Sequence, residues 1–149
     1  MALRTILTGN DPSLRRISRP VTNFDDRLHI LLDDMRETLI EADGVGLAAP
    51  QVGVLRRAVI VLIGEDYVEL INPEIIGRSG EQTGPEGCLS VPGVSGTVTR
   101  PNYVKVRAQD RNGCFFEIGG EALCARAFCH ETDHLDGKLF TDFVTEYID

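Results

Sequence analysis

The stretch Cys129-His130-Glu131-Thr132-Asp133-His134 contains the pattern HExxH, and the interpretation of the whole chain starts from it. Residues four apart on an α-helix lie on the same face, so His130 and His134 can direct two imidazole nitrogens at one metal ion. A carboxylate beside such an ion, here Glu131, is the usual general base of metal-assisted hydrolysis. HExxH also occurs by chance on solvated helices, so the flanking residues must decide between a metal site and a solvated face.

The residues before HExxH favour a metal site. Helical steps back from His134 give one stripe, which consists of His130, Ala127 and Leu123. This apolar stripe predicts that both histidines point into the protein. Two buried imidazoles on adjacent turns need polar partners, and a shared metal ion supplies them. Because catalytic metals normally have three protein ligands and one open position, we expect a third ligand from elsewhere in the chain.

Cys88 is the strongest candidate for the third ligand. The longer pattern HExxHxxGxxH fails because Phe140 occupies its third histidine position, and Glu146 lies on an end that we expect to fray. His29 belongs to a distant amphipathic segment. Cys88 lies in the Gly- and Pro-bounded stretch 86–93 (EGCLSVPG), which we expect to be a loop of the kind that holds catalytic groups. A thiolate there would complete a Cys-His-His site.

Three motifs together resemble the signature motifs of the peptide deformylase family, in the same order and with similar spacing. They are GVGLAAPQ at 44–51, EGCLS at 86–90 and HETDH at 130–134, and the segments 6–15 and 100–101 are also similar to that family. The resemblance implies hydrolytic removal of the formyl group from the N-terminal methionine of new polypeptides, with release of formate. It covers most of the chain.

The resemblance also implies roles for single residues. It implies one divalent metal ion held by three ligands, Cys88, His130 and His134. Metal-bound hydroxide would attack the formyl carbon, with Glu131 first as general base and then as acid. The Gln51 side chain and the Leu89 backbone N–H would stabilise the negative charge on the formyl oxygen. Asp133 matches a family position that we expect to help orient a ligand histidine.

A pocket for the methionine side chain and the peptide is the next implication. The matching positions are Gly44, Val45, Gly46, Glu86, Gly87, Leu123, Arg126 and Ala127. Alternatives remain open at several of them: leucine and alanine are equally expected in a core, and the glycines from Gly44 onward could simply form a turn. Glu86 could contact a peptide N–H or pair with Arg126 or another cation.

The resemblance implies Fe2+ as the metal, although Zn2+, Ni2+ and Co2+ suit the same donors. The expected partners are the formyl-Met N-termini of nascent chains. Contact with the ribosome is expected to be transient, because no Lys or Arg follows Lys138. One departure from the family is Cys129, which stands where many members have glutamine and removes no ligand.

Length and composition predict one domain that spans residues 1–149. The net charge of -8 argues against nucleic acid or an anionic membrane as a main partner. Neither a signal peptide nor a spanning segment is evident, so we expect a cytoplasmic protein with reduced cysteines.

The hydrophobic pattern predicts an α+β domain in which antiparallel strands enclose a central HExxH helix. One helix should begin near Asp25 and stop at Gly44. The expected strands are 58–63, 67–71, 94–99, 103–109 and 114–118, with hairpins at 64–66 and 112–113. Pro73 should end the second strand, Ile75-Ile76 could add a short strand, and 78–85 is a polar stretch that should lead into the Cys88 loop. Gly119-Gly120 should end the sheet pattern before the HExxH helix, which Gly137 should end.

Two other functions fit the sequence less well. A metallopeptidase sharing HExxH would cleave internal peptide bonds, but its usual downstream ligand is missing. A non-catalytic, zinc-stabilised binding domain would need a fourth protein ligand, and the sequence offers no clear candidate.

Overall fold

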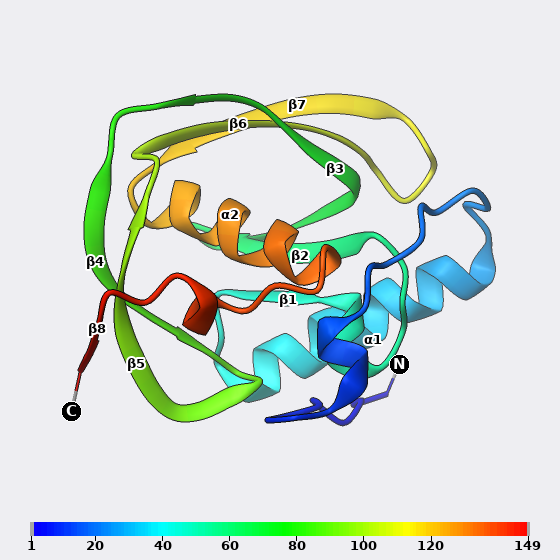
Figure 1. Ribbon diagram of the computed structural model, residues 1–149. Helices are drawn as coiled ribbons and strands as arrows, with labels where there is room; N and C mark the ends of the chain where they lie inside the picture. The colour runs from blue at the N-terminus through cyan, green and yellow to red at the C-terminus, as the bar shows by residue number, and fades with distance from the viewer. Residues whose placement is uncertain (1, 149) are drawn as a thin grey trace.

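The computed structural model describes residues 2–148, in which two helices accompany two antiparallel sheets (Figure 1). The helices are α1 (Asp26–Ala42) and α2 (Leu123–Leu135), and the short 3-10 helices are η1 (Pro12–Arg15), η2 (Ala49–Val52) and η3 (Phe140–Asp142). The five-stranded sheet has the order β1 (Gly46–Ala48), β2 (Ala58–Ile63), β3 (Asp66–Ser79), β6 (Tyr103–Gln109), β7 (Phe115–Glu121). The three-stranded sheet has the order β4 (Gln82–Cys88), β5 (Val91–Arg100), β8 (Glu146–Ile148). The predicted α+β class with antiparallel strands is confirmed.

Helix α1 begins and ends close to the predicted residues. The Asp25 carboxylate caps its first turn by accepting a hydrogen bond from the Leu28 N–H at 3.2 Å. At the other end Asp43, rather than Gly44, takes the left-handed conformation, with φ of 54°. Asparagine and aspartate tolerate this conformation better than most residues, so the helix stops one residue earlier than the glycine suggested.

Strands β1 and β2 are buried on both faces, because α1 covers one face of the sheet there and α2 covers the other. Successive side chains of a strand point to opposite faces. Leu47 and Ile60 therefore pack in the cluster with α1, whereas Ala48, Val59 and Val61 pack in the cluster with α2. Figure 1 shows α1 and α2 on either side of these two strands. This arrangement explains why 58–63 reads as a continuous apolar run rather than an alternating one.

Three predicted strand boundaries are wrong. Strand β3 continues past Pro73. Its pairing with β6 is irregular between Ile71 and Glu74, so the regular ladder does not need the N–H that proline lacks at this position. No strand was predicted in the polar stretch before Cys88, but from Gln82 onward it forms β4, which pairs with β5. Strand β7 runs through Gly119-Gly120, where close packing leaves no room: a Cβ at Gly119 would lie 2.5 Å from the Tyr103 hydroxyl oxygen.

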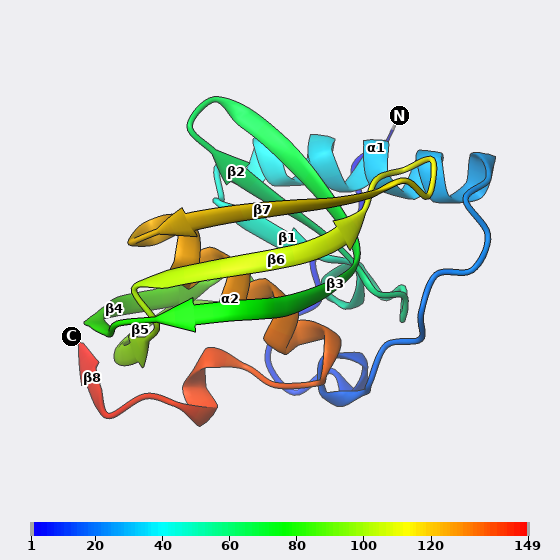
Figure 2. The ribbon, with the colours of Figure 1, turned by 90° about the horizontal axis from the view of Figure 1, so that it is seen from above.

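Two smaller expectations also need correction. Leu123 does not continue the buried stripe, because it is the first residue of α2 and its side chain is 61% exposed. Glu146 does not lie on an unpaired end, since it opposes Thr97 where β8 joins the edge of β5 (Figure 2). Between residues 2 and 148 no helix has the length and apolar character needed to cross a membrane.

We predict that Leu32→Ala, in the middle of α1, lowers the free energy of unfolding by about 2–5 kcal/mol. Leu32 is completely buried, so truncation leaves a cavity in the cluster between α1 and the sheet. The matched control is Ile30→Ala on the same helix, whose side chain is 56% exposed and which should cost less than about 0.5 kcal/mol. Urea unfolding followed by circular dichroism measures both values, and equal losses would show that α1 packs differently.

Candidate metal centre

His130 and His134 lie one turn apart on the buried face of α2. His130 is 8% exposed and His134 is 1% exposed, and their Nε2 atoms are 3.3 Å apart. Burial lowers the pKa of His134 to about 3. His134 is therefore neutral, as a metal ligand must be, and α2 presents two imidazole nitrogens at one point.

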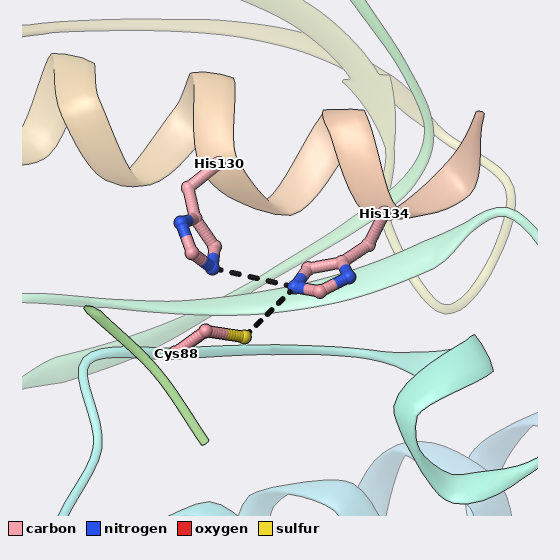
Figure 3. Close-up of side chains that lie close together, drawn as sticks. All are labelled: Cys88, His130 and His134. Atoms are coloured by element: carbon pink, nitrogen blue, oxygen red, sulfur yellow. Dashed lines mark hydrogen bonds between the residues drawn. The ribbon is translucent and has the colours of Figure 1, made fainter. Parts of the chain in front are cut away.

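Cys88 reaches the same point from the end of β4. Its Sγ atom lies 3.4 Å from Nε2 of His134, and the three ligand atoms of Cys88, His130 and His134 all lie within 4.8 Å of one another (Figure 3). A thiolate with two imidazoles suits divalent zinc, iron, nickel or cobalt. The described residues therefore bring together three protein donors that fit a transition metal.

Glu86 holds the ring of His130 in place. Nδ1 of His130 lies 2.7 Å from Oε1 of Glu86, which leaves Nε2 directed at the cluster. Two arginines also donate to this carboxylate: Arg126 at 3.0 Å, and Arg100 through two nitrogens at 3.0 and 3.2 Å. Burial alone would raise the pKa of Glu86, but the hydrogen bonds from His130 and Arg100 lower it to about 2. Of the two alternatives left open by the sequence, the structure shows the pairing with cations.

Arg100 is a residue of the site that the sequence did not identify. Besides Glu86, it donates to Asp133 at 2.8 Å. Asp133 was expected to orient a ligand histidine, but its contact with a ligand is indirect and runs through Arg100 and Glu86. Only similarity around 100–101 pointed to this region, because Arg100 lies far in sequence from both of its partners.

Glu131 is buried directly after the ligand His130 on α2, and its carboxylate lies against Gly46 of β1. A Cβ at Gly46 would lie 2.5 Å from Oε2 of Glu131, so this close approach requires glycine. Burial raises the pKa of Glu131 to about 7, against the opposing positive charge of His130. Within residues 2–148, Oε1 of Glu131 has no hydrogen-bond partner. The carboxyl group is thus able to exchange a proton near neutral pH.

Gln51 is fixed so that its amide NH2 faces Cys88. The backbone N–H of Ala48 donates to its Oε1 atom at 2.9 Å, which assigns the other end of the amide as the donor. That donor lies 3.1 Å from the Ser90 hydroxyl and 3.6 Å from the Cys88 sulfur. Ser90 was not singled out from the sequence. Its place at the end of the EGCLS motif, two residues after Cys88 in the turn to β5, is the signal that could have found it.

A cavity of about 660 Å³ opens in front of these groups. Its lining includes every residue predicted for peptide or methionine binding: Gly44, Val45, Gly46, Glu86, Gly87, Leu123, Arg126 and Ala127. Gln51, Cys88, Leu89, His130 and Glu131 line it as well, whereas His134 is not part of the lining. Val45 and Leu123, 44% and 61% exposed, offer apolar surface to a ligand. The predicted substrate residues and the metal-binding group therefore share one cavity.

Comparison with known proteins gives a consistent result. The sequence model of the family described as "Polypeptide deformylase" matches residues 3–147. The peptide deformylase of Alkaliphilus metalliredigens is 59% identical over 142 residues, which cover 95% of this chain and 97% of that protein. The peptide deformylase of Caldanaerobacter subterraneus is 56% identical over 149 residues, covering 100% and 94%.

Solved structures agree with the sequence comparison. The crystal structure of a peptide deformylase from Legionella pneumophila superposes with a TM-score of 0.93 at 46% identity, covering 96% of this chain and 86% of that one. The enzyme from Thermotoga maritima gives 0.93 at 40% identity, covering 96% and 98%. The chain therefore belongs to the polypeptide deformylase family, enzymes that remove the formyl group from the N-termini of new polypeptides.

Proposed function

We propose that this chain hydrolyses the formyl amide of formyl-methionyl nascent polypeptides, with one divalent ion held by Cys88, His130 and His134 and with Glu131 as the base. The observation that carries the proposal is the convergence of these three ligand atoms within 4.8 Å, beside a buried carboxyl group and a substrate-sized cavity. When bound, the ion acts as a Lewis acid on water and on the formyl oxygen. Fe2+ is the metal that we propose for the cell.

Glu131 has the position and the proton affinity for the transfer steps. With a pKa of about 7, its carboxylate can take a proton from the attacking water at neutral pH. The same group then returns that proton to the nitrogen of the leaving amine, so that formate and a free N-terminus are released. The absence of a side chain at Gly46 leaves the space that the Glu131 carboxylate occupies.

Gln51 and Leu89 supply hydrogen-bond donors for the reaction. The NH2 group of Gln51 is already turned toward Cys88 in the free protein, so no reorientation is needed as charge develops on the formyl oxygen. The backbone N–H of Leu89 follows directly after Cys88 in the turn between β4 and β5. Losing one such donor typically costs about 3 kcal/mol of barrier.

The peptide is proposed to bind as an extended strand between the two sheets. Gly46 lies on β1 and Gly87 on β4, and each of these strands stands at the edge of its sheet. Edge strands have unpaired backbone groups that can bond an added strand. The apolar surface of Val45 and Leu123 then suits the methionine side chain.

Glu131→Gln should retain the metal but lower the rate of formate release from formyl-Met-Ala-Ser by at least about 100-fold, because a general base is lost and no ligand is. Metal content and activity are measured on the same sample. Glu41→Gln, on the exposed surface of α1, is the control and should leave both unchanged. A mutant that loses its metal would show that Glu131 is a ligand instead.

Loss of a residue that only hydrogen-bonds a metal ligand typically weakens metal binding by about 10–100-fold. Cys88→Ser should weaken it by more than this. The thiolate is a direct donor in the proposed site, whereas Cys114, Cys124 and Cys129 are not part of the metal-binding group. Cys129→Ser is the matched control, since Cys129 is buried on the same helix as the histidines. Competition with a chelator measures the affinities, and equal metal loss in both variants would refute the assignment.

Protein purified without oxygen should contain iron and lose activity in air, while nickel-substituted protein should keep its activity. A ferrous ion beside a thiolate is open to oxidation of both the metal and the cysteine sulfur. Metal analysis and formate release before and after exposure to air test this. Air-stable activity in an iron-free zinc form, as fast as the nickel form, would contradict it.

A further inference from the structure

A second cavity, of about 610 Å³, lies apart from the first and shares no lining residue with it. Its walls come from the connection between η1 and α1, which runs along the outside of the molecule (Figure 2), from the first turns of α1, and from the loop after η2. Polar side chains of this lining include Thr22 and Asn23, and Leu28 and Leu31 contribute apolar surface. None of these residues has a role in the proposed reaction.

The cavity is basic although the chain as a whole carries a net charge of -8. Four arginines line it, Arg4, Arg19, Arg27 and Arg56, together with a single acidic residue, Asp25. Arg4 is neutralised by Asp34 at 3.0 Å. Among residues 2–148, the other three arginines form no ion pair with a carboxylate. Three arginines without an ion-pair partner therefore line this cavity, against one carboxylate, that of Asp25.

Backbone pairing holds two of these arginines side by side. Arg19 and Arg56 form a parallel β-bridge, supported by hydrogen bonds from the Arg19 N–H to the Leu55 carbonyl at 3.1 Å and from the Arg57 N–H to the Arg19 carbonyl at 2.9 Å. Residues paired across neighbouring extended segments carry their side chains on the same side. Both are exposed and both line the cavity. The fold thus places two guanidinium groups on one wall.

Arg27 adds a third positive charge where it does not help the helix. It lies in the first turn of α1, whose N-terminal end already carries the positive end of the helix dipole, so a cation there is unfavourable. Two carboxylates oppose this charge: Asp25, which also accepts the capping hydrogen bond from the Leu28 N–H, and Asp26 in the same turn, which is not part of the cavity lining. The positive potential of the helix end and of three arginines is therefore directed into the same cavity.

We propose that this cavity binds a small ligand with two or more phosphate groups, such as pyrophosphate or a nucleoside di- or triphosphate. Guanidinium groups bind phosphate oxygens in pairs, and several unpaired arginines suit a charge that one phosphate alone would not balance. The cavity volume lies in the range of small-molecule sites. A long RNA fits less well, because the chain as a whole carries a net charge of -8, which disfavours binding of an extended polyanion.

Isothermal titration calorimetry of the full-length, nickel-loaded protein tests the proposal, with pyrophosphate, ATP and a short single-stranded RNA as separate probes. We expect pyrophosphate and ATP to bind the wild-type protein, and the double variant R19Q/R56Q to bind them at least about tenfold more weakly. If pyrophosphate binds as tightly as ATP, the phosphate groups account for the binding that the proposal predicts.

The control is R78Q, which removes an exposed arginine on β3 that is remote in sequence from the cavity lining and forms no ion pair within the described residues. It should change the affinity by no more than about twofold. Formate release by R19Q/R56Q should equal that of the wild type, which verifies folding. Pyrophosphate that only coordinates the catalytic metal would bind this variant unchanged, and that result would overturn the proposal. Lack of binding to the wild type, or binding of RNA alone, would overturn it equally.

Discussion

The buried carboxylate of Glu86 is the interaction on which the rest of the site depends. It is 7% exposed and bonded to Arg100, Arg126 and His130, so it connects β4, β5 and α2. A buried charge is tolerated only when it is paired and hydrogen-bonded, and here two arginines balance the charges of Glu86 and Asp133. Removing one partner of such a pair commonly costs about 3–5 kcal/mol, because the other charge stays buried without compensation.

This ionic cluster connects the fold to the proposed chemistry. It fixes the His130 ring through Nδ1, and it joins the three-stranded sheet, which carries Cys88, to the helix that carries both histidines. The third group, Glu131, is positioned differently, by close packing against Gly46 of the five-stranded sheet. Each sheet therefore constrains a different part of the site, and α2 lies between these constraints. Small shifts of α2 would separate the metal-binding atoms, and the ion pairs of Glu86 and Asp133 oppose such shifts.

Much of this arrangement could be predicted from sequence, for identifiable reasons. The apolar period of α1, the alternation along β6 and the hairpin turn at 112–113 are local signals, and each element occurs where it was expected. The motifs around Gln51, Cys88 and His130 are also local, and they converge in the structure on one cavity. The resemblance of three motifs, rather than HExxH alone, identified the family.

The failures have a common physical origin. Pro73, Gly119 and Gly120 break strands by intrinsic preference, but a bulge absorbs the proline and close tertiary packing requires the glycines. Arg100 and Ser90 could not be assigned because their roles depend on partners that are distant in sequence, Glu86 with Asp133 and Gln51 respectively. Leu123 followed the helical period of the histidines, yet it begins the helix and stays exposed. The spacing of residues indicates which face of a helix they share, but it does not show how far along that face the neighbouring sheet covers the helix.

The most direct test of the account is a crystal structure of the metal-loaded protein, with the ion located by anomalous scattering. The account predicts one ion between Sγ of Cys88, Nε2 of His130 and Nε2 of His134, at about 2.0–2.3 Å from each atom. It also predicts that Nδ1 of His130 keeps its bond to Glu86 and that Glu131 stays outside the coordination shell. An ion bound elsewhere, or one that takes Glu131 as a ligand in place of Cys88, would contradict it.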